Sequence, residues 1–436
     1  MIYPRRALQR RLDELREGLD GGVVDKLAER LNCPGKDSVA AMWEVVVLHG
    51  LSRGGALQNE VALPSGRRPD IVFEQGALRF TADVTAVSDE GLNKDNPYRE
   101  LHDLIEQAKR KLKLPIGGLD VTVRARHDRT KRGTRTVLML PPRGRLQQFV
   151  SQTVVPLLRE QIDAGKTVLR FAIDDDDIGL DITIDPAKSP YSSGSFATYD
   201  TPKIKDRNPL YHALRGKADQ LRGADGVTGV IVGDGDCVAL SRRAANWDEV
   251  STQQIVTEFF RQFSSIDFVL LLSVQETKSG FGVFPPPVRE NVASLFARAG
   301  CEARAGLNSL FDAMVRHFPT PTMTPVNGAL RAREEGYGLG HHGGYTMSGS
   351  KVRMGLREFT EIFAGLRTLR DSGAKNVEAA RSHLQDSNPV QAIVVRNLLE
   401  GRLPASIEII KTDENDNDDW IEIHFGEIDP AIAPLR

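Results

Sequence analysis

The sequence has few cysteines and no long apolar run. Its three cysteines, Cys33, Cys237 and Cys301, stand far apart, which argues against a disulfide framework and against a zinc site of the CxxC type. No stretch of about 18 apolar residues exists, so we expect no membrane-spanning helix and no membrane partner. The arginine-rich N-terminus, residues 1–12, lacks the apolar core of a signal peptide. We therefore expect a cytoplasmic protein.

An excess of charge of one sign is also lacking. The 436 residues carry 57 Lys and Arg against 59 Asp and Glu, a formal net charge of −2, unlike a protein that coats nucleic acid non-specifically. The charge is nevertheless uneven, because residues 101–150 hold 12 Lys and Arg against 4 acids, and residues 401–436 hold 3 against 9. The basic stripe suits a phosphate backbone. The alternative is a solvated helix face followed by a charged loop.

The periodicity of the apolar residues predicts a mixed α/β protein. Helices are expected near residues 4–32, 40–50, 98–112, 146–164, 208–222, 252–263, 291–299, 307–316, 356–372, 376–384 and 389–400. Strands are expected near residues 56–63, 69–73, 78–87, 119–126, 167–173, 178–184, 226–232, 267–274, 405–410 and 420–425. Residues 127–135 are expected to form a basic loop.

Three carboxylates stand at informative places between residues 43 and 96. Glu44 lies on the helix before the first strands, Asp70 begins the second strand, and Asp83 lies in the middle of the third. Strand residues alternate between the two faces of a sheet, so Asp83 faces away from its apolar neighbours Phe80 and Val84. A carboxylate inside a strand this apolar needs a partner, a proton or a metal ion.

Asp70 and Asp83 belong to neighbouring strands of a hairpin, so their side chains can converge. Two hard oxygen ligands suit Mg²⁺, or Mn²⁺, which keeps waters and substrate phosphate oxygens as its other ligands. Such an ion would activate water and neutralise charge on a phosphate. In the structural alternative, Asp70 caps a turn, Asp83 accepts a backbone hydrogen bond and Glu44 is an exposed helix residue.

The order of these motifs resembles a known nuclease core. A helix with Glu44, a strand, Arg68-Pro69-Asp70, a hairpin, Asp83-Val84-Thr85 and a further helix are similar to the αβββα core of the PD-(D/E)XK nuclease superfamily, which includes restriction endonucleases and phage-defence effectors. The resemblance implies an α/β, restriction-endonuclease-like fold. It also implies that Glu44, Asp70 and Asp83 are catalytic residues that hold the metal ion.

One position departs from the family pattern. The family places a lysine two residues after the second acid, where it orients the attacking water, and this sequence has Thr85 there. The resemblance then requires a lysine from elsewhere. Lys94 in the following loop is one candidate, and Lys109 or Lys111 on the next expected helix is another.

The resemblance implies a metal-dependent DNA endonuclease of restriction or anti-phage defence type. The DNA backbone would be contacted by Lys109, Arg110, Lys111, Lys113, Lys131 and Arg132. Cleavage of both strands needs two active sites, so a homodimer, a larger complex or an accessory defence protein is expected. One alternative, favoured by Thr85, is an inactive nuclease-fold module that binds nucleic acid or assembles a defence complex. Another is an interaction protein whose acids only satisfy hydrogen bonds.

The chain is accordingly divided into five parts. They are an N-terminal helical segment (1–36), the nuclease-like core (37–135), a second α/β region (136–335), a glycine-rich linker (336–352) and a helical tail with a closing hairpin (353–436). Lys217 is considered as a phosphate contact on a second wall of a DNA cleft, or as part of an ordinary helix. The acidic hairpin 413–419 is either a phosphate mimic or a solubilising turn.

Overall fold

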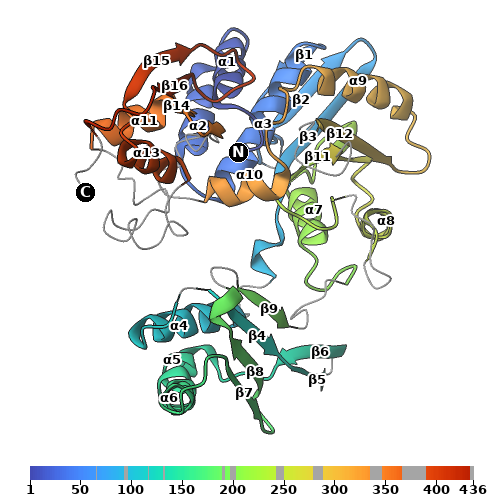
Figure 1. Cartoon of the computed structure of the whole chain (residues 1–436). Helices are drawn as coiled ribbons and strands as arrows, with labels where there is room; N and C mark the ends of the chain where they lie inside the picture. Colours follow the sequence, from blue (N-terminus) through green and yellow to red (C-terminus); the bar gives the residue numbers. More distant parts are fainter. Residues whose placement is uncertain are drawn as a thin grey trace. The chain divides into compact units, whose positions relative to one another are not determined.

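The computed structural model describes residues 1–64, 66–92, 97–115, 117–130, 133–188, 192–196, 203–241, 250–277, 288–333, 346–365 and 389–432. The chain is a mixed α/β protein of two compact units (Figure 1). The larger unit consists of Met1–Asp89 and Pro202–Arg436, and the smaller unit is Glu90–Thr201. The smaller unit is therefore an insertion into the chain of the larger one.

The larger unit is built on a six-stranded sheet in the order β1-β2-β3-β10-β11-β12. Its strands are β1 (Ala56–Gln58), β2 (Ile71–Gln75), β3 (Leu78–Val87), β10 (Val227–Asp234), β11 (Phe268–Thr277) and β12 (Val288–Ala297). The first three form an antiparallel meander, β10 and β11 continue parallel to β3, and β12 returns antiparallel. The whole insertion lies in the connection between the parallel neighbours β3 and β10.

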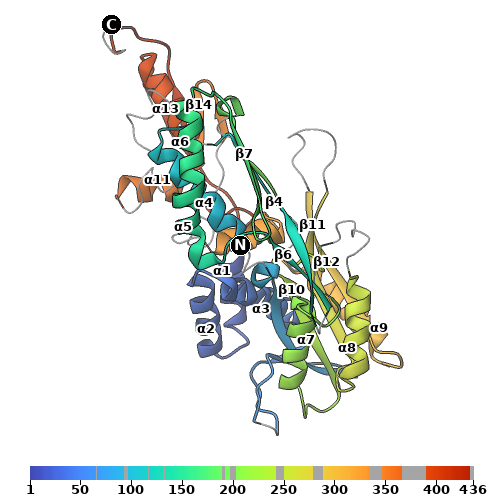
Figure 2. The ribbon, with the colours of Figure 1, turned by 90° about the horizontal axis from the view of Figure 1, so that it is seen from below.

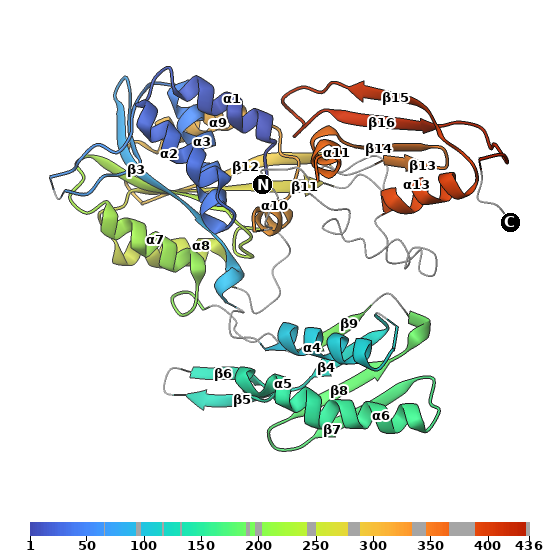
Figure 3. The ribbon, with the colours of Figure 1, turned by 90° about the vertical axis from the view of Figure 1, so that its left-hand side faces the viewer.

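Helices cover both faces of this sheet (Figure 3). One face carries α1 (Arg5–Leu15), α2 (Gly21–Asn32), α3 (Lys36–Ser52), α9 (Arg304–Arg316) and α10 (Pro325–Ala332), and the other carries α7 (Pro209–Gln220) and α8 (Thr252–Gln262). Helix α3 is buried from Ala41 to Leu51 because it lies between the sheet and the outer helices. This position explains why most of its residues from Ala41 to Leu51 are apolar, since a helix covered on all sides needs no polar face, and it leaves Glu44 and His49 as buried polar side chains.

The smaller unit has its own sheet and its own core (Figure 2). The sheet order is β7-β8-β4-β9, with β4 (Leu119–Val123), β7 (Leu169–Asp174), β8 (Gly179–Ile184) and β9 (Ser193–Phe196). Helices α4 (Tyr98–Lys111), α5 (Leu146–Phe149) and α6 (Val155–Asp163) pack their apolar side chains on one face of this sheet. A separate hairpin, β5 (Ala125–Thr130) with β6 (Gly133–Leu138), replaces the expected basic loop.

A third sheet is formed by residues near the C-terminus of the larger unit. Strands β13 (Thr346–Ser348), β14 (Lys351–Gly355), β15 (Pro404–Ile410) and β16 (Trp420–Phe425) pair in the order β13-β14-β16-β15, together with α11 (Leu356–Phe363) and α13 (Pro389–Leu399). Asp419 in the acidic hairpin pairs with Arg6 of α1 at 2.8 Å, and Glu414 pairs with Arg10 and Arg11 at 2.8 and 3.0 Å. The partner of this hairpin is thus the basic N-terminal helix of the same chain.

Several sequence predictions differ from the structure. Residues 291–297 of the expected helix 291–299 belong to β12, because ten consecutive residues, 288–297, pair with β11. The compact units divide at Asp89 and Thr201, and the predicted boundary at residue 135 lies inside the smaller unit. The predicted helix 376–384 and most of the glycine-rich linker lie outside the described residues. Among the helices that the structure describes, none has the length and apolar character needed to cross a membrane.

Asp234, the last residue of β10, is buried and organises the turn that follows it. Its Oδ1 accepts hydrogen bonds from the backbone N–H groups of Asp236 and Cys237, both at 3.0 Å, and its Oδ2 accepts one from Ser273 Oγ at 2.6 Å. Burial raises the pKa of the Asp234 carboxyl to about 6, because the charged form loses its hydration.

The raised pKa of Asp234 predicts a pH dependence of stability. The folded chain takes up this proton more readily than the unfolded chain, so the contribution of the group is full below about pH 4 and is lost as the pH rises through about 6. Asp234→Asn keeps an oxygen for the two N–H groups and does not titrate. We expect the unfolding free energy of the variant to rise relative to that of the wild type as the pH increases from about 4 to 6.5. Urea unfolding measures both values. A pH-independent difference would contradict this assignment.

Candidate active site

Asp70 and Asp83 are brought together by the register of the β2–β3 hairpin. Ile71 pairs with Ala82, so Asp70, one residue before β2, lies opposite Asp83, and directly opposed residues have adjacent side chains. The Asp70 N–H donates to Asp83 Oδ1 at 3.0 Å, and the Val84 N–H donates to Asp70 Oδ2 at 2.7 Å. Both acids therefore accept backbone hydrogen bonds, as the structural alternative expects, but they also share one location.

Lys217 of α7 places an ammonium group between these acids. Its Nζ lies 3.5 Å from Asp70 Oδ2 and 3.9 Å from Asp83 Oδ1. Helix α7 begins at Asn208, whose side chain caps it by accepting the Tyr211 N–H at 3.1 Å. Its buried residues are Leu210, Tyr211, Leu214 and Ala218. Lys217 lies next to this apolar face, so its stem follows the packed side of the helix while its ammonium reaches the acids.

The sequence offered Lys217 as a phosphate contact or as part of an ordinary helix, and did not predict its position between Asp70 and Asp83. Thr85 lies on β3 two residues after Asp83, where the family pattern has a lysine, and α7 supplies an amine from the facing helix instead. The signal in the sequence was Asn208-Pro209, which starts a helix directly before the strongly apolar strand Val227–Val232. A helix followed by a buried parallel strand indicates an element packed on the same sheet.

Glu44 is positioned by its neighbour in sequence, Trp43. The Trp43 indole Nε1–H donates to the backbone oxygen of Asp234 at 2.9 Å, which fixes α3 against the end of β10. Gly233 leaves room for this ring, since a Cβ atom there would come within 2.1 Å of it. Glu44, the next residue, is consequently held at a defined position beside the sheet.

Arg30 of α2 is the direct partner of Glu44. Arg30 Nη1 lies 2.6 Å from Glu44 Oε2, and the same guanidinium contacts both carboxylate oxygens of Asp37 at 3.1 and 3.2 Å. Sequence reasoning assigned no role to Arg30. Its signal in the sequence is weak, because an arginine near the end of an amphipathic helix is commonly a solvated residue.

The two cations of the site, Arg30 and Lys217, do not fully offset the cost of its negative charges. Burial and, to a smaller extent, the charge of Asp70 raise the pKa of Glu44 to about 7 against the opposing effect of Arg30. Burial and the charge of Asp70 likewise raise the pKa of Asp83 to about 6 against the opposing effect of Lys217. Because each raised pKa reports a costly negative charge, an additional cation would stabilise this group of acids.

The donor set fits a divalent ion in part. Asp83 Oδ2 is buried and has no hydrogen-bond partner among the described residues, and an orphaned carboxylate oxygen beside a second carboxylate suits Mg²⁺ or Mn²⁺. The three predicted ligands, Glu44, Asp70 and Asp83, do not meet at one point. Among the described residues, the acids and histidines whose ligand atoms lie within 4.8 Å of one another as a group of three are Glu408, Glu422 and His424. Glu44 is paired with Arg30 instead.

The Glu408, Glu422 and His424 group on the C-terminal sheet already has a cation. Lys351 Nζ lies 2.6 Å from Glu422 Oε1, and His424 Nε2 lies 2.8 Å from the same oxygen. These contacts neutralise the buried member of the group. The cluster is therefore explained by ion pairing across β14 and β16.

Lys109 requires a correction, because it does not offer its ammonium to a phosphate. Its side chain is 0 % exposed, and Nζ donates to Gly117 O at 2.5 Å and to Glu106 at 2.8 Å. The chain turns back after α4 with positive φ at Gly117 and Gly118, and a buried ammonium must find partners there. The residues Arg110, Lys111 and Lys113 are exposed at the end of α4, while Lys94, Lys131 and Arg132 lie outside the described residues.

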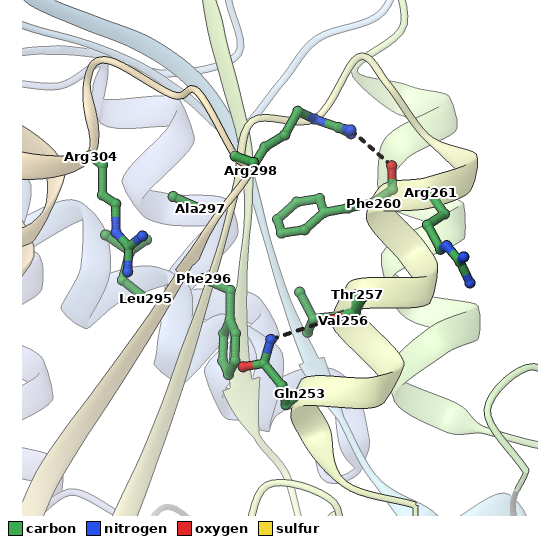
Figure 4. Close-up of a pocket in the computed structure, with 11 residues that line it drawn as sticks. Gln253, Val256, Thr257, Phe260, Arg261, Leu295, Phe296, Ala297, Arg298 and Arg304 are labelled. Atoms are coloured by element: carbon green, nitrogen blue, oxygen red, sulfur yellow. Dashed lines mark hydrogen bonds between the residues drawn. The ribbon is translucent and has the colours of Figure 1, made fainter.

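A separate hollow of about 480 Å³ lies between α8 and β12 (Figure 4). Arg298 stands over the Phe260 ring, and its guanidinium donates to the backbone oxygens of Phe260, Phe263 and Ile266. These bonds satisfy carbonyl groups at the end of α8, so Arg298 acts as a helix cap. The hollow contains none of the predicted site residues.

The position of Lys217 predicts a metal-dependent effect on stability. We expect Lys217→Met to lower the unfolding free energy by about 1–3 kcal/mol in EDTA near pH 8, because two neighbouring carboxylates lose their cation. Mg²⁺ or Mn²⁺ at millimolar concentration should restore much of the loss. Thermal unfolding with and without metal measures both effects. Arg222→Gln, which removes an exposed pair on the same segment, serves as the control, and a loss at Lys217 that metal leaves unchanged would speak against a shared cation position.

Comparison of the chain with models of known protein families, with curated proteins and with solved structures gives no match. The chemistry of this chain is accordingly inferred from its own residues. The features that define the site are two opposed strand carboxylates, an ammonium between them and a buried glutamate held by an arginine.

Proposed function

We propose that the chain is a metal-dependent nuclease of the PD-(D/E)XK type that hydrolyses phosphodiester bonds of DNA. The observation that carries the proposal is the convergence of Asp70, Asp83 and Lys217, in which the amine lies 3.5 and 3.9 Å from the two carboxylates. Two acids and a lysine are the groups that the resemblance requires. Here the lysine comes from α7, while Thr85 stands at its usual position.

The order of the elements also supports the proposal. With residues 90–201 set aside, the chain reads α3, the meander β1-β2-β3, α7, and β10 parallel to β3. The helix, the three-stranded meander and the second helix follow the αβββα order that the resemblance implies, and β10 comes after them. In this interpretation α7, and not the expected helix near 98–112, is the second helix of the core.

Each residue of the site has a defined task in this reaction. Asp70 and the orphaned Asp83 Oδ2 would hold a divalent cation, with Glu44 as a third ligand after it leaves Arg30. A cation bound there would neutralise charge at the scissile phosphate. Lys217 is close enough to both acids to hold the attacking water or a phosphate oxygen by a charge-assisted hydrogen bond. The water oxygen forms the new bond to phosphorus and the water gives up one proton, one bridging P–O bond breaks, and the leaving oxygen takes up a proton, so that overall one water is consumed.

A second candidate function is retained for a specific reason. Thr85 occupies the family lysine position and Glu44 is engaged by Arg30, so an inactive nuclease-fold module that binds nucleic acid or assembles a defence complex is the alternative. An active enzyme that cuts both strands would need a second active site, for which a homodimer or a partner subunit is proposed. The biological setting proposed for either form is restriction or anti-phage defence.

Cleavage assays test the proposed reaction. Purified protein is incubated with supercoiled, linear and single-stranded DNA in Mg²⁺, Mn²⁺ or EDTA. We expect metal-dependent cleavage that falls by about 100-fold or more in Asp70→Asn, Asp83→Asn and Lys217→Met, because each variant removes a group that acts on the phosphate or the water.

Asp219→Asn is the matched control for these variants. Asp219 lies on the same helix two residues after Lys217 and pairs with the exposed Arg222, so its loss should change the rate less than about twofold. Cleavage that persists in EDTA or in Asp83→Asn would contradict the proposal. DNA binding without cleavage would support the inactive module.

The exposed cations at the end of α4 predict part of the DNA affinity. Changing Arg110, Lys111 and Lys113 together to Gln should weaken binding to all sequences alike and reduce the slope of log K against log salt by roughly 0.9 for each phosphate that is no longer neutralised. Fluorescence anisotropy across a salt series measures the slope. Arg159→Gln with Lys166→Gln, exposed on the same unit, is the control, and an unchanged slope in the triple variant would show that the stripe is only a solvated face.

A further inference from the structure

Arg30 borders the acid group from a different helix than the residues considered so far. It lies in the last turn of α2, and its guanidinium bridges Glu44 on one side and Asp37 on the other. The two partners differ in environment, because the Glu44 side chain is 12 % exposed and the Asp37 side chain is 62 % exposed. The Arg30 side chain itself is 34 % exposed, so it is partly accessible to solvent.

This arrangement gives Glu44 two competing uses. Its carboxylate is held by Arg30, yet Asp70 and Lys217 are also close enough to shift its pKa, Asp70 upward and Lys217 downward. A cation beside Asp70 and Asp83 would attract Glu44 away from Arg30. The guanidinium would then keep only the exposed Asp37, and an exposed ion pair is weak.

A released guanidinium at this position suits a phosphate. Its planar set of donors matches two phosphate oxygens. Lys26 lies four residues earlier on α2 and on the same face of the helix, and it is paired to the exposed Glu60 at 3.6 Å. The face of α2 defined by Lys26 and Arg30 thus presents two cations, of which Arg30 contacts Glu44 of the candidate active site.

We propose that Arg30 is a substrate-binding residue that Glu44 holds in the resting chain, and that it passes to a phosphate of the bound nucleic acid when Glu44 turns to the metal ion. The inference rests on the proposed function and adds a way in which metal and nucleic acid binding depend on each other. Because a single side chain moves from one partner to another, each ligand strengthens the binding of the other.

The dependence is measured as DNA affinity of the full chain in EDTA and in Ca²⁺, an ion of the same charge used to avoid turnover. The wild-type chain should bind a duplex about 10-fold more tightly in Ca²⁺. Arg30→Ala and Arg30→Gln should lose most of that gain while they keep the affinity measured in EDTA. Glu44→Gln, in which Arg30 is already free, should bind DNA more tightly than wild type in EDTA and gain little from Ca²⁺.

Arg16→Ala is the matched control. Arg16 lies before α2 and forms an exposed pair with Asp25 of α2, so this variant should keep the full Ca²⁺-dependent gain in DNA affinity. Thermal unfolding of every variant identifies those that do not fold. Arg30→Gln retains hydrogen-bond donors for Glu44, so it serves as the second variant if Arg30→Ala does not fold. Equal losses of affinity in EDTA and Ca²⁺ in both Arg30 variants would overturn the proposal. So would a Glu44→Gln chain whose affinity in EDTA equals that of wild type.

Titration of the chain with Mn²⁺ alone distinguishes a failure of this proposal from a failure of the proposed nuclease function on which it rests. Asp83→Asn should weaken Mn²⁺ binding by about 10-fold or more, and Arg30→Ala should strengthen it severalfold, because Glu44 is then free. If wild type and Asp83→Asn bind Mn²⁺ equally, the metal site and this inference both fail. If Asp83→Asn weakens Mn²⁺ binding but the Arg30 variants keep the full Ca²⁺-dependent gain in DNA affinity, only the role of Arg30 fails.

Discussion

The constraint on which the site depends is the burial of one carboxylate in the centre of a sheet. Asp83 lies in β3 between apolar neighbours and is almost fully buried, and a charge in that place is costly unless other groups compensate it. The compensation comes from two groups, the backbone N–H of Asp70 and the ammonium of Lys217, while Oδ2 has no hydrogen-bond partner among the described residues. A one-residue slip of the β2–β3 register would turn Asp83 to the α3 side and remove both.

The insertion between β3 and α7 is compatible with this constraint because of the way the sheet is connected. Two parallel neighbours must be joined by a crossover, whatever its length, and the entropic cost of closing a loop rises only slowly with the number of residues. A compact unit of its own, residues 90–201, therefore fits into the connection between β3 and β10. The pairing of β3 with β10 and the packing of α7 still place Lys217 against Asp83.

Local patterns in the sequence predicted the part of the site that lies within one hairpin. The strand 78–87 and the opposition of Asp70 and Asp83 follow from alternation and from a short turn, both of which act over a few residues. The origin of the amine could not be obtained in this way, since Lys217 is 134 residues after Asp83 in sequence and meets it only through the packing of the sheet. The same limit explains β12, where pairing with β11 overrides the local helical pattern of residues 291–299.

Charge counted along the chain misled for a related reason, because the sign of a residue does not reveal its partner. Lys109 adds to the basic stripe in sequence, yet its ammonium closes a turn inside the smaller unit. The acidic hairpin was a candidate phosphate mimic, yet two of its acids, Asp419 and Glu414, pair with Arg6, Arg10 and Arg11 of α1. When such internally paired charges are set aside, the net charge of −2 no longer describes the surface that a ligand meets. In the described residues, the cations that pair with the acids of the candidate site are Lys217, beside Asp70 and Asp83, and Arg30, beside Glu44.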